Sequence, residues 1–553
     1  MSEKEAASAA FFIWRRLRLP RAPVALPLAP ALLVLVAAAY VLPGVLAHDP
    51  WKTEDAIGIG IVHQMLVHGQ WLIPHLAGEP YFDDGPLYYW LAALCAKIAS
   101  PILAVHDGAR LASALAMGAA LACVYHTGRE LYDRAAGTAA ALVLLGSLGL
   151  LVHAHETLAE MGMLAAHAFA LLAIAIAPRH VGRAALLLGV GLVSALLSKG
   201  PAAVVAPALA ALAAPALSER WRTRRYALAL AGGVALAAAV ALGWGFWVES
   251  RYPGLAWALL RLEVSDFAVP GWRGASGYAE VLAWAAWPAW PIAAWALWER
   301  RHRAYEPGTR LLIVAAAASL AVVLAHRDVR EVHAMQAILP LAVLAGSSAG
   351  TLRRGAANAL AWFGALSAIL FGLVVWLGWL VMMSGHPERI ARGYTRLEPG
   401  FVAQFSWIAL LVALALTLGW VWLLLRAERS TLRGVTYWCC GLVLVWGLLM
   451  TLMLHWIDYG KSYRPVALSM RKAIPENVRC IESRGLGEAQ RAAFDYHAEV
   501  LTVRLERRDT AGCPMLLVQG TPDVGEGVGP GWIFVWEGNR PRDHERYRLY
   551  RRQ

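Results

Sequence analysis

Long apolar stretches alternate with short polar links along most of this chain. The stretches are about 16 to 24 residues long, close to the roughly 20 residues that a helix needs to cross a hydrocarbon core of about 30 Å. A transmembrane β-barrel would instead alternate apolar and polar residues in short segments. The pattern predicts a polytopic α-helical membrane protein with about thirteen spans, near 29–48, 109–128, 136–153, 161–178, 182–199, 201–217, 226–248, 281–298, 310–325, 336–350, 358–381, 404–425 and 434–455.

Composition and charge agree with a membrane location. Of 553 residues, 59% are hydrophobic and only 16% are charged, so lipid must be the solvent for most of the chain. The net charge of +12 comes from arginines in short clusters between apolar runs, which favours the positive-inside rule over nucleic-acid binding. The loops on the same side of the membrane as the N-terminus contain about twice as many basic residues as the short loops on the opposite side. This asymmetry predicts a cytoplasmic N-terminus, which acts as a signal anchor, and an external C-terminus.

Two regions depart from the pattern of spans. Residues 49–108 form the longest non-terminal external segment and contain two short apolar helices, at 58–72 and 85–105, that we expect to lie along the interface. From residue 457 the chain becomes polar and alternates helical segments with strand-like runs at 478–484, 515–520 and 532–538. We therefore expect a transmembrane domain over 1–456 and a small external α/β domain over 457–553.

Carboxylates crowd the expected external loops. Carboxylates beside lipid are costly and mark functional sites, although solvated loop charges are the alternative for each one taken alone. In the first loop they are Asp49, Glu54, Asp55, Asp83 and Asp84. A second group, near the start of the fourth span, has Glu156 and Glu160 beside His153 and His155.

Two carboxylates from separate loops suit glycosyl transfer, in which one removes a proton from an acceptor hydroxyl and the other orients a substrate. A lipid-phosphate donor also requires cations. The external candidates are Lys199, Arg261, Arg273, Arg327 and Arg330.

Residues 51–90, WKTEDAIGIGIVHQMLVHGQWLIPHLAGEPYFDDGPLYYW, resemble the first periplasmic loop of the bacterial aminoarabinose and protein-mannosyl transferase superfamily, whose members read W-x-P-D-E-x-R-Y and then G-D-W-x-x-P-x-L-N-G-x-x-Y-F-x-K-P-P-L-x-Y-W. The similarity continues at HETLAEMGM and LLSKGPAAVVAP. The resemblance implies the GT-C glycosyltransferase fold, with polyprenyl-phosphate sugars as donors.

The resemblance also implies roles for individual residues. Glu54 falls on the family's catalytic Asp, Asp55 on the neighbouring Glu, Glu160 on the acid of the second loop, and His155 on the Arg five residues before it. Tyr81 lies in the matched Y-F pair and is a candidate for substrate binding.

The chain departs from the family pattern at two positions. Ile57 stands where the family has Arg, and Asp84 stands where the family has the Lys that holds donor phosphate. The phosphate would then be held through a divalent cation, Mg²⁺ or Mn²⁺, on Asp83 and Asp84, or directly by Lys199, Arg327 or Arg330.

The resulting hypothesis is an inverting glycosyltransferase of the bacterial inner membrane. It would pass a sugar from undecaprenyl phosphate to a lipid, glycan or protein acceptor on the periplasmic side, with Glu54 as base, or Asp55 if the register differs by one residue. Glu160 would orient the acceptor. An inactive relative with a binding role and a lipid or solute transporter are the alternatives, and sugar, acceptor and oligomeric state stay open.

The polar tail contains two of the six cysteines. Cys480 and Cys513 each adjoin a strand-like run, and an oxidising periplasm favours pairing of cysteines in a small domain. We expect a disulfide between them.

Overall fold

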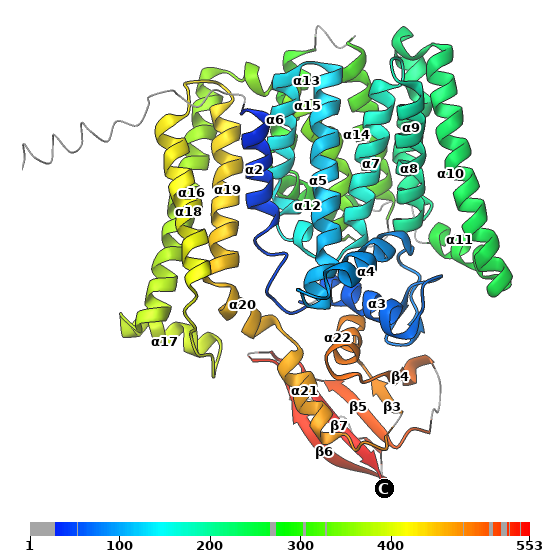
Figure 1. Cartoon of the computed structure of the whole chain (residues 1–553), viewed down its shortest axis with the longest axis vertical. Helices are drawn as coiled ribbons and strands as arrows, with labels where there is room; N and C mark the ends of the chain where they lie inside the picture. The colour runs from blue at the N-terminus through cyan, green and yellow to red at the C-terminus, as the bar shows by residue number, and fades with distance from the viewer. Residues whose placement is uncertain are drawn as a thin grey trace, which may run out of the picture.

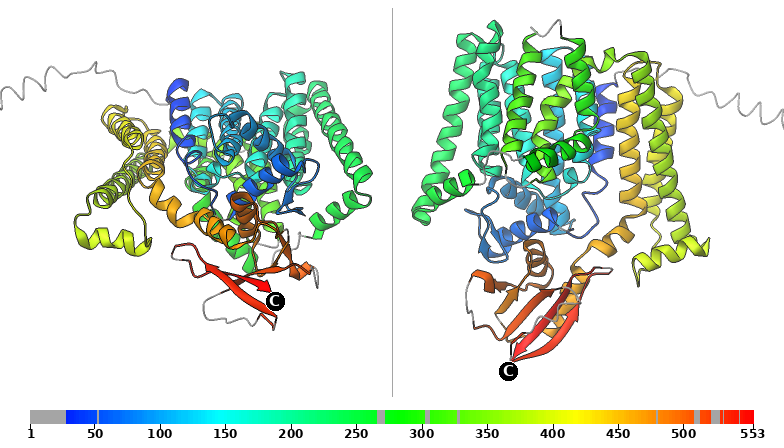
Figure 2. Two further views of the ribbon diagram at one scale, coloured as in Figure 1. Left: turned by 60° about the horizontal axis from the view of Figure 1, so that its bottom comes forward. Right: turned by 180° about the vertical axis from the view of Figure 1, so that it is seen from behind.

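The computed structural model describes residues 28–553 except 52, 266–271, 302–305, 327–328, 479, 508–511, 521–527, 530 and 542. A layer of long, roughly parallel helices forms one part of the molecule, and a small domain containing a sheet lies beyond one end of them (Figure 1). The first-loop helices lie between the two parts (Figure 2). The predicted class, a mostly helical membrane protein with a small C-terminal α/β region, is confirmed.

Within the described residues, nine helical segments are long and apolar enough to cross a bilayer, or ten if the bent pair Arg134–Leu145 and Leu148–His155 is one span. The nine are α5 (Val105–Leu131), α7 (Ala159–Ile176), α8 (Val181–Lys199), α10 (Arg224–Arg251), α14 (Pro307–Ala325), the segment Glu331–Thr351 that contains α15 (Met335–Ser348), α16 (Arg354–Ser384), α18 (Trp407–Arg426) and α19 (Arg433–Leu452).

The expected count of thirteen is not confirmed, although each predicted span coincides with a helix. The remaining four coincide with shorter or interrupted helices. The span at 281–298 is divided at Pro288, and the span at 136–153 bends by 60° after α6. These helices are α2 (Pro30–Val41), α6 (Arg134–Leu145), α9 (Ala202–Leu217), and the pair α12 (Trp272–Ala285) and α13 (Ala289–Glu299).

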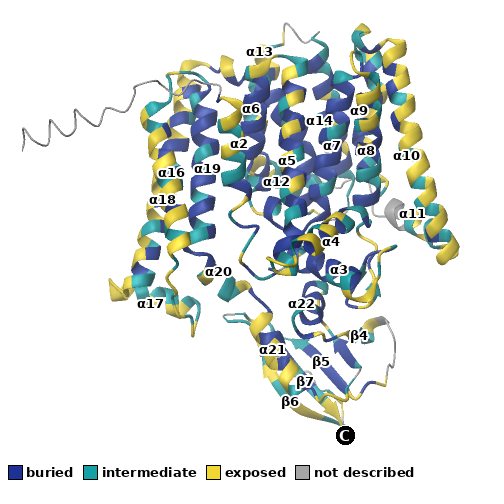
Figure 3. Ribbon diagram, in the orientation of Figure 1, coloured by how far each residue is buried: buried dark blue, intermediate teal, exposed yellow. Residues whose placement is uncertain are grey.

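Burial separates central helices from peripheral ones. Most residues of α7 and α19 are buried, whereas α10, α16 and α18 expose long rows of apolar side chains (Figure 3). Apolar surface of this extent requires lipid as its solvent. A membrane-embedded bundle explains why these sequences are apolar around the whole helix.

The first loop folds over one end of the bundle. It contains α3 (Glu54–His68), the small hairpin of β1 (His75–Leu76) and β2 (Glu79–Pro80), and α4 (Leu87–Ala99). With 13 residues, α4 is about 20 Å long, too short to cross the bilayer. Both helices predicted in this loop are present, with bounds shifted by a few residues.

Two further segments that were predicted to be external loops contain helices. The stretch 249–280 includes α11 (Leu255–Ser265) and the start of α12, and 382–403 includes α17 (Glu388–Leu397). The α17 helix is amphipathic and packs against the end of α16.

The C-terminal region begins with α20 (Leu454–Lys461) and α21 (Arg464–Ala473), followed by a sheet with α22 (Glu488–Ala498) between its first two strands. Strand order is β4-β3-β5-β7-β6; β3 is parallel to β4 and β5, and the other pairs are antiparallel. The strands are β3 (Ile481–Arg484), β4 (Thr502–Arg504), β5 (Met515–Gly520), β6 (Trp532–Gly538) and β7 (Arg546–Arg552).

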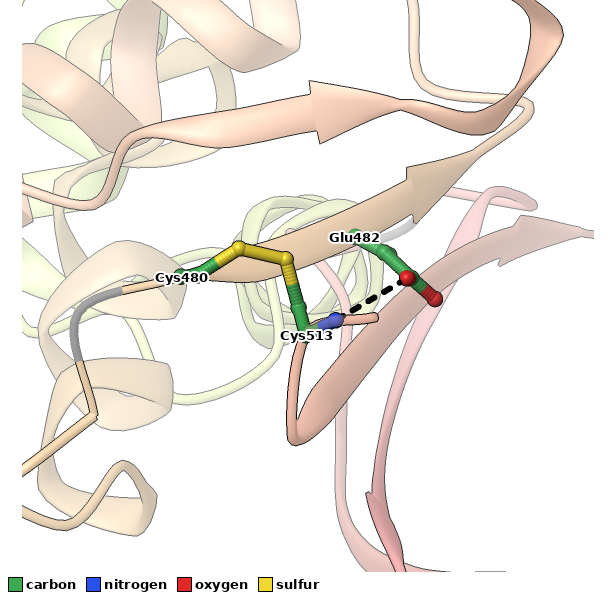
Figure 4. The surroundings of a disulfide bond; sticks show 3 residues. All are labelled: Cys480, Glu482 and Cys513. Atoms are coloured by element: carbon green, nitrogen blue, oxygen red, sulfur yellow. Dashed lines mark hydrogen bonds between the residues drawn. A yellow bond between two sulfur atoms is a disulfide. The ribbon is translucent and has the colours of Figure 1, made fainter. Parts of the chain in front are cut away.

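Cys480 and Cys513 form a disulfide with Cα atoms 5.2 Å apart. Each cysteine precedes one of the paired strands β3 and β5, and the Cys513 amide donates to Glu482 Oε1 at 3.1 Å (Figure 4). Because the two strands are neighbours and run parallel, their N-terminal ends lie side by side, and so do the two cysteines that precede them.

Helix α22 attaches the C-terminal region to the first loop. Ala492 lies against Gly60 of α3 so closely that a Cβ at Gly60 would be 2.7 Å from the Ala492 Cβ. Beside this contact, Arg491 and Arg504 both bind Glu79, at 3.0 and 2.5 Å. The C-terminal region therefore supports the loop that carries Glu54.

Candidate functional site

Glu54 is the first residue of α3. Its side chain is 19% exposed, whereas that of the neighbouring Asp55 is fully buried. Its Oε1 accepts a hydrogen bond from Arg330 Nη2 at 2.6 Å. Its Oε2 is buried and has no hydrogen-bond partner within the described part of the chain. A buried, unpaired carboxylate oxygen is costly, so this atom is free to accept a hydrogen bond from a ligand.

Asp55 has a different environment. Both its side chain and that of Arg110 are fully buried, and Arg110 Nη2 donates to Asp55 Oδ2 at 2.7 Å. The Thr157 amide donates to the other oxygen at 2.8 Å. Burial alone would raise the pKa of Asp55, but the charge and hydrogen bonds of Arg110 outweigh it and hold that pKa below its usual value. Asp55 is therefore a structural ion-pair partner, and the alternative in which it acts as the base does not fit its surroundings.

A second charged group joins Glu160, Asp84 and Lys199. Lys199 Nζ lies 2.5 Å from Asp84 Oδ1 and 3.0 Å from Glu160 Oε1. Tyr89 donates its hydroxyl to the other Asp84 oxygen at 2.6 Å. Glu160 Oε2 is buried without a hydrogen-bond partner in the part of the chain that the structure describes. Glu160 thus repeats the arrangement of Glu54: one oxygen holds a cation and the other is available.

Close backbone packing fixes these groups. The Gly85 amide donates to the Ser198 carbonyl at 2.9 Å, and a Cβ at Gly85 would collide with Leu197. This contact places Asp84 beside Lys199, the last residue of α8. On the other side, a Cβ at Gly58 would overlap the Thr157 carbonyl. Small residues are required wherever backbones approach this closely.

The two carboxylates belong to one electrostatic environment. Burial would lower the pKa of Arg330, but its hydrogen bond with Glu54 and the negative charges of Glu54 and Glu160 raise it above the usual value. The guanidinium therefore stays charged. Arg330 is also partly accessible, with 40% of its side-chain surface exposed. It can contact a ligand while it holds Glu54.

Histidines border this environment on the side of α15. His333 accepts or donates a hydrogen bond with the Tyr278 hydroxyl at 3.0 Å, and its ring lies 4.2 Å from that of His326. His153 is bonded to Glu156 at 2.8 Å. These side chains can donate to, or accept from, hydroxyl groups of a bound sugar.

Several predicted residues lie elsewhere or are outside the described residues. His155 is buried, and its ring nitrogens bond the carbonyls of Leu151 and Tyr40 at 2.9 and 2.8 Å; it is a structural residue and not a phosphate ligand. Asp83 is exposed, whereas Tyr81 is buried near Asp84 and Glu160. Arg327 and the side chain of Arg273 lie outside the described residues, and Arg261 is exposed on α11.

The predicted cation site at Asp83 and Asp84 has little room for a metal ion. Lys199 and Tyr89 already engage both oxygens of Asp84. The positive charge that a metal would supply next to Asp84 is supplied by Lys199. The residues present therefore fit a lysine-centred site better than a metal site.

Three residues of this arrangement, Arg110, Tyr89 and His333, were not predicted from the sequence. Arg110 lies within a predicted span, Tyr89 is one of several aromatic residues after Asp84, and His333 lies in a short polar link. Arg110 could have been identified as a charged residue within an apolar run. Such residues are rare in membrane spans and usually pair with a group of opposite charge.

The chain is similar in sequence to several known proteins. The family described as "Dolichyl-phosphate-mannose-protein mannosyltransferase" matches residues 83–244. Undecaprenyl phosphate-alpha-4-amino-4-deoxy-L-arabinose arabinosyl transferase 1 from Pseudomonas fluorescens (strain Pf0-1) is 31% identical over 122 residues, 22% of this chain and 21% of the relative. The corresponding transferase from Pseudomonas savastanoi pv. phaseolicola (strain 1448A / Race 6) is 26% identical over 432 residues, 75% of each chain. The chain thus matches about a fifth of the length of the first relative and three quarters of the second.

Solved structures show the same fold. The crystal structure of ArnT from Cupriavidus metallidurans bound to undecaprenyl phosphate superposes with a TM-score of 0.68 at 16% identity, covering 94% of this chain and 97% of that one. Its apo structure gives 0.67 with the same coverage. The architecture is therefore the GT-C fold of membrane glycosyltransferases. In sequence, the chain is similar to these transferases over part or most of its length.

Proposed function

We propose that this protein transfers a sugar from a polyprenyl phosphate to an acceptor hydroxyl or amine. The observation that carries the proposal is the pair of carboxylates, Glu54 and Glu160. Each has one oxygen held by a cation and one buried oxygen without a hydrogen-bond partner among the described residues. Relatives named as undecaprenyl-phosphate aminoarabinose transferases and a similar fold bound to undecaprenyl phosphate support this donor class.

Glu54 acts as the base in this mechanism. Its free Oε2 accepts the proton of the acceptor hydroxyl while the acceptor oxygen attacks the anomeric carbon. The bond between that carbon and the phosphate oxygen breaks, and the polyprenyl phosphate leaves as the anion. Attack from the face opposite the leaving group inverts the anomeric configuration. The hydrogen bond from Arg330 to Oε1 fixes the orientation of the Glu54 carboxylate.

Lys199 and Arg330 are the proposed cations for the donor phosphate. Both are at least partly accessible and both are held by a carboxylate that fixes their position. A preorganised cation stabilises the charge that develops on the leaving phosphate. Arg327, a further cation predicted from the sequence, lies outside the described residues.

Glu160 is proposed to orient the acceptor through its free Oε2. The acceptor class, a lipid, a glycan or a protein, is set by the outer segments at 249–280 and 382–403. Because Lys199 occupies the position beside Asp84, we propose that transfer does not depend on Mg²⁺ or Mn²⁺ at Asp83 and Asp84.

The proposed location is the bacterial inner membrane, with the N-terminus cytoplasmic and the C-terminal domain, residues 457–553, in the periplasm. Basic residues are concentrated in the loops expected on the same side of the membrane as the N-terminus, which is the cytoplasmic side by the positive-inside rule. The disulfide between Cys480 and Cys513 supports an oxidising compartment for the domain.

The variants Glu54→Gln and Glu160→Gln test the function. Each keeps the shape of the side chain and removes its charge, so we expect transfer in membranes to fall by about 10² to 10⁴-fold for Glu54→Gln, with unchanged expression. Glu160→Gln should lower transfer by a smaller factor and raise the apparent KM for acceptor. Asp83→Asn, an exposed carboxylate of the same loop, is the matched control and should transfer sugar at the parent rate.

Two outcomes decide the assignment. Parent-level transfer by Glu54→Gln would show that another group is the base. Absence of transfer by the parent chain with every polyprenyl-phosphate sugar offered would favour an inactive relative with a binding role.

A further inference from the structure

Three side chains with metal-binding atoms meet between α3 and α22, away from the charged groups described above. His63 and His68 lie on α3, and Asp495 lies on α22. One ligand atom from each lies within 4.8 Å of the other two. His63 is nine residues along α3 from Glu54, a distance of about 14 Å at 1.5 Å per residue. This cluster is therefore separate from the proposed reaction site.

The spacing suits a single small ion. Nitrogen and oxygen ligands bind Zn²⁺ at about 2.0 to 2.2 Å, so tetrahedral ligand atoms lie about 3.3 to 3.6 Å apart. The three atoms, all within 4.8 Å of one another, need to approach by no more than about 1.5 Å. His63 Nε2 and Asp495 Oδ1 are 4.0 Å apart, too far for a hydrogen bond and close enough to share an ion.

Neighbouring groups orient two of the three ligands. Gln64 Nε2 donates to Asp495 Oδ2 at 2.6 Å, which leaves Oδ1 facing His63. The His63 ring packs edge-on against Tyr496, with ring centroids 5.5 Å apart. Ligands of bound metals characteristically have such supporting contacts. Asp495 is also almost fully buried, so solvent does not compensate its charge.

The surroundings favour a cation. His68 ends α3, and the C-terminal end of a helix attracts positive charge. Glu499, just beyond α22, adds a negative charge near His63. His68 is exposed, which leaves a coordination position open to water.

We propose that His63, His68 and Asp495 bind one Zn²⁺ ion, or a similar transition-metal ion, that joins the C-terminal domain to the first external loop. Two imidazoles and one carboxylate select Zn²⁺ over Mg²⁺ and Ca²⁺, which prefer all-oxygen ligands. The ion cross-links α3 to α22 and so reinforces the support of the loop that begins at Glu54. It takes no part in sugar transfer.

The test uses the full-length chain in detergent or nanodiscs, stripped with a chelator and then dialysed against Zn²⁺. Elemental analysis is expected to find one Zn²⁺ per chain. Substituted Co²⁺ should give the intense visible absorption of a four-coordinate site. Zn²⁺ should raise the midpoint temperature of thermal unfolding.

Variants at the three ligands distinguish this site from adventitious binding. His68→Ala, which changes an exposed side chain, is expected to weaken Zn²⁺ binding at least tenfold and to abolish the thermal shift, and Asp495→Asn should do the same. His75→Ala is the matched control, because His75 lies in the same loop and bonds only the Ile73 carbonyl among the partners that the structure records. Equal Zn²⁺ affinity in the parent and His68→Ala, or a Co²⁺ spectrum typical of six-coordinate solvent-exposed ions, would overturn the proposal.

Discussion

At the scale of single residues, two adjacent carboxylates have opposite roles. Glu54 and Asp55 are neighbours at the start of α3, so their side chains point about 100° apart around the helix. Glu54 faces Arg330 and keeps one oxygen free, whereas Asp55 faces the interior and is saturated by Arg110 and backbone amides. Accessibility therefore favours Glu54 as the proposed base and places Asp55 in a buried ion pair with Arg110.

This division predicts different results for two similar substitutions. Asp55→Asn removes the nearer of two carboxylates that pair with the buried Arg110 guanidinium and leaves only Asp107, at 3.3 Å. We therefore expect the free energy of unfolding to fall by about 3 kcal/mol. Glu54→Gln should keep its stability near that of the parent, because Oε2 has no partner to lose and Gln still accepts from Arg330. Thermal unfolding of both purified variants measures the difference.

The double variant Asp55→Leu with Arg110→Met serves as a control. Replacing both charges by apolar groups should recover much of the stability that Asp55→Asn loses. An Asp55→Asn chain that is as stable as the parent and yet inactive would contradict the structural role of Asp55.

How far the sequence could identify the site depended on the kind of residue. Glu54 and Glu160 could be proposed from the matched motifs, and the structure places both in polar surroundings with a cation. The pairing of Lys199 with Asp84 could not be predicted, because it depends on the approach of the Gly85 loop to the end of α8. The structural role of His155 depends on carbonyls of distant segments, which no local pattern reports.

At the scale of elements, the spacing of apolar residues along the sequence correctly predicted the helices and strands that are long or strongly apolar. The strands at 515–520 and 532–538 coincide with β5 and β6. Strand β4 has only three residues, and β7 reads RYRLYRR, in which arginines alternate with buried Tyr547 and Leu549. Neither was predicted, because the first is too short for a period and the second resembles a basic tail.

The disulfide gives a test at this scale. It closes a segment with a sequence separation of 33 residues, and chain-entropy arguments assign such a link about 3 to 4 kcal/mol. We expect Cys480→Ser with Cys513→Ser to lower the unfolding temperature of the C-terminal domain. In intact spheroplasts without reductant, alkylation should leave both cysteines unmodified.

The outcome also reports orientation. A cytoplasmic domain would keep both thiols reduced. Free alkylation of Cys480 and Cys513 without reductant would therefore contradict either the pairing or the proposed periplasmic location. Cys95, which is a partly exposed free thiol, is the control for alkylation in the same preparation.

At the scale of the whole molecule, the proposed site depends on three parts: the apolar helices, the first loop and the C-terminal region that contacts it. The long helices α10, α16 and α18 expose apolar surface suited to lipid, and the first loop lies over one end of the bundle (Figure 1). A polyprenyl chain can stay in the bilayer while its phosphate reaches Lys199 and Arg330 at the end of the bundle. The division between spanning helices and a polar tail was evident from composition. The number of spans was not evident from composition, because short or bent apolar helices do not show from sequence whether they cross the membrane.

The lipid that co-purifies with the Glu54→Gln variant tests the central claim most directly. With the base removed, bound donor should persist, because the anomeric bond to phosphate is not broken. Mass spectrometry of lipids extracted from this variant is expected to find a polyprenyl phosphate carrying a sugar, enriched over the parent chain, in which spent polyprenyl phosphate should predominate. Finding no polyprenyl phosphate, with or without sugar, above the amount bound by an unrelated membrane protein from the same cells would contradict the account.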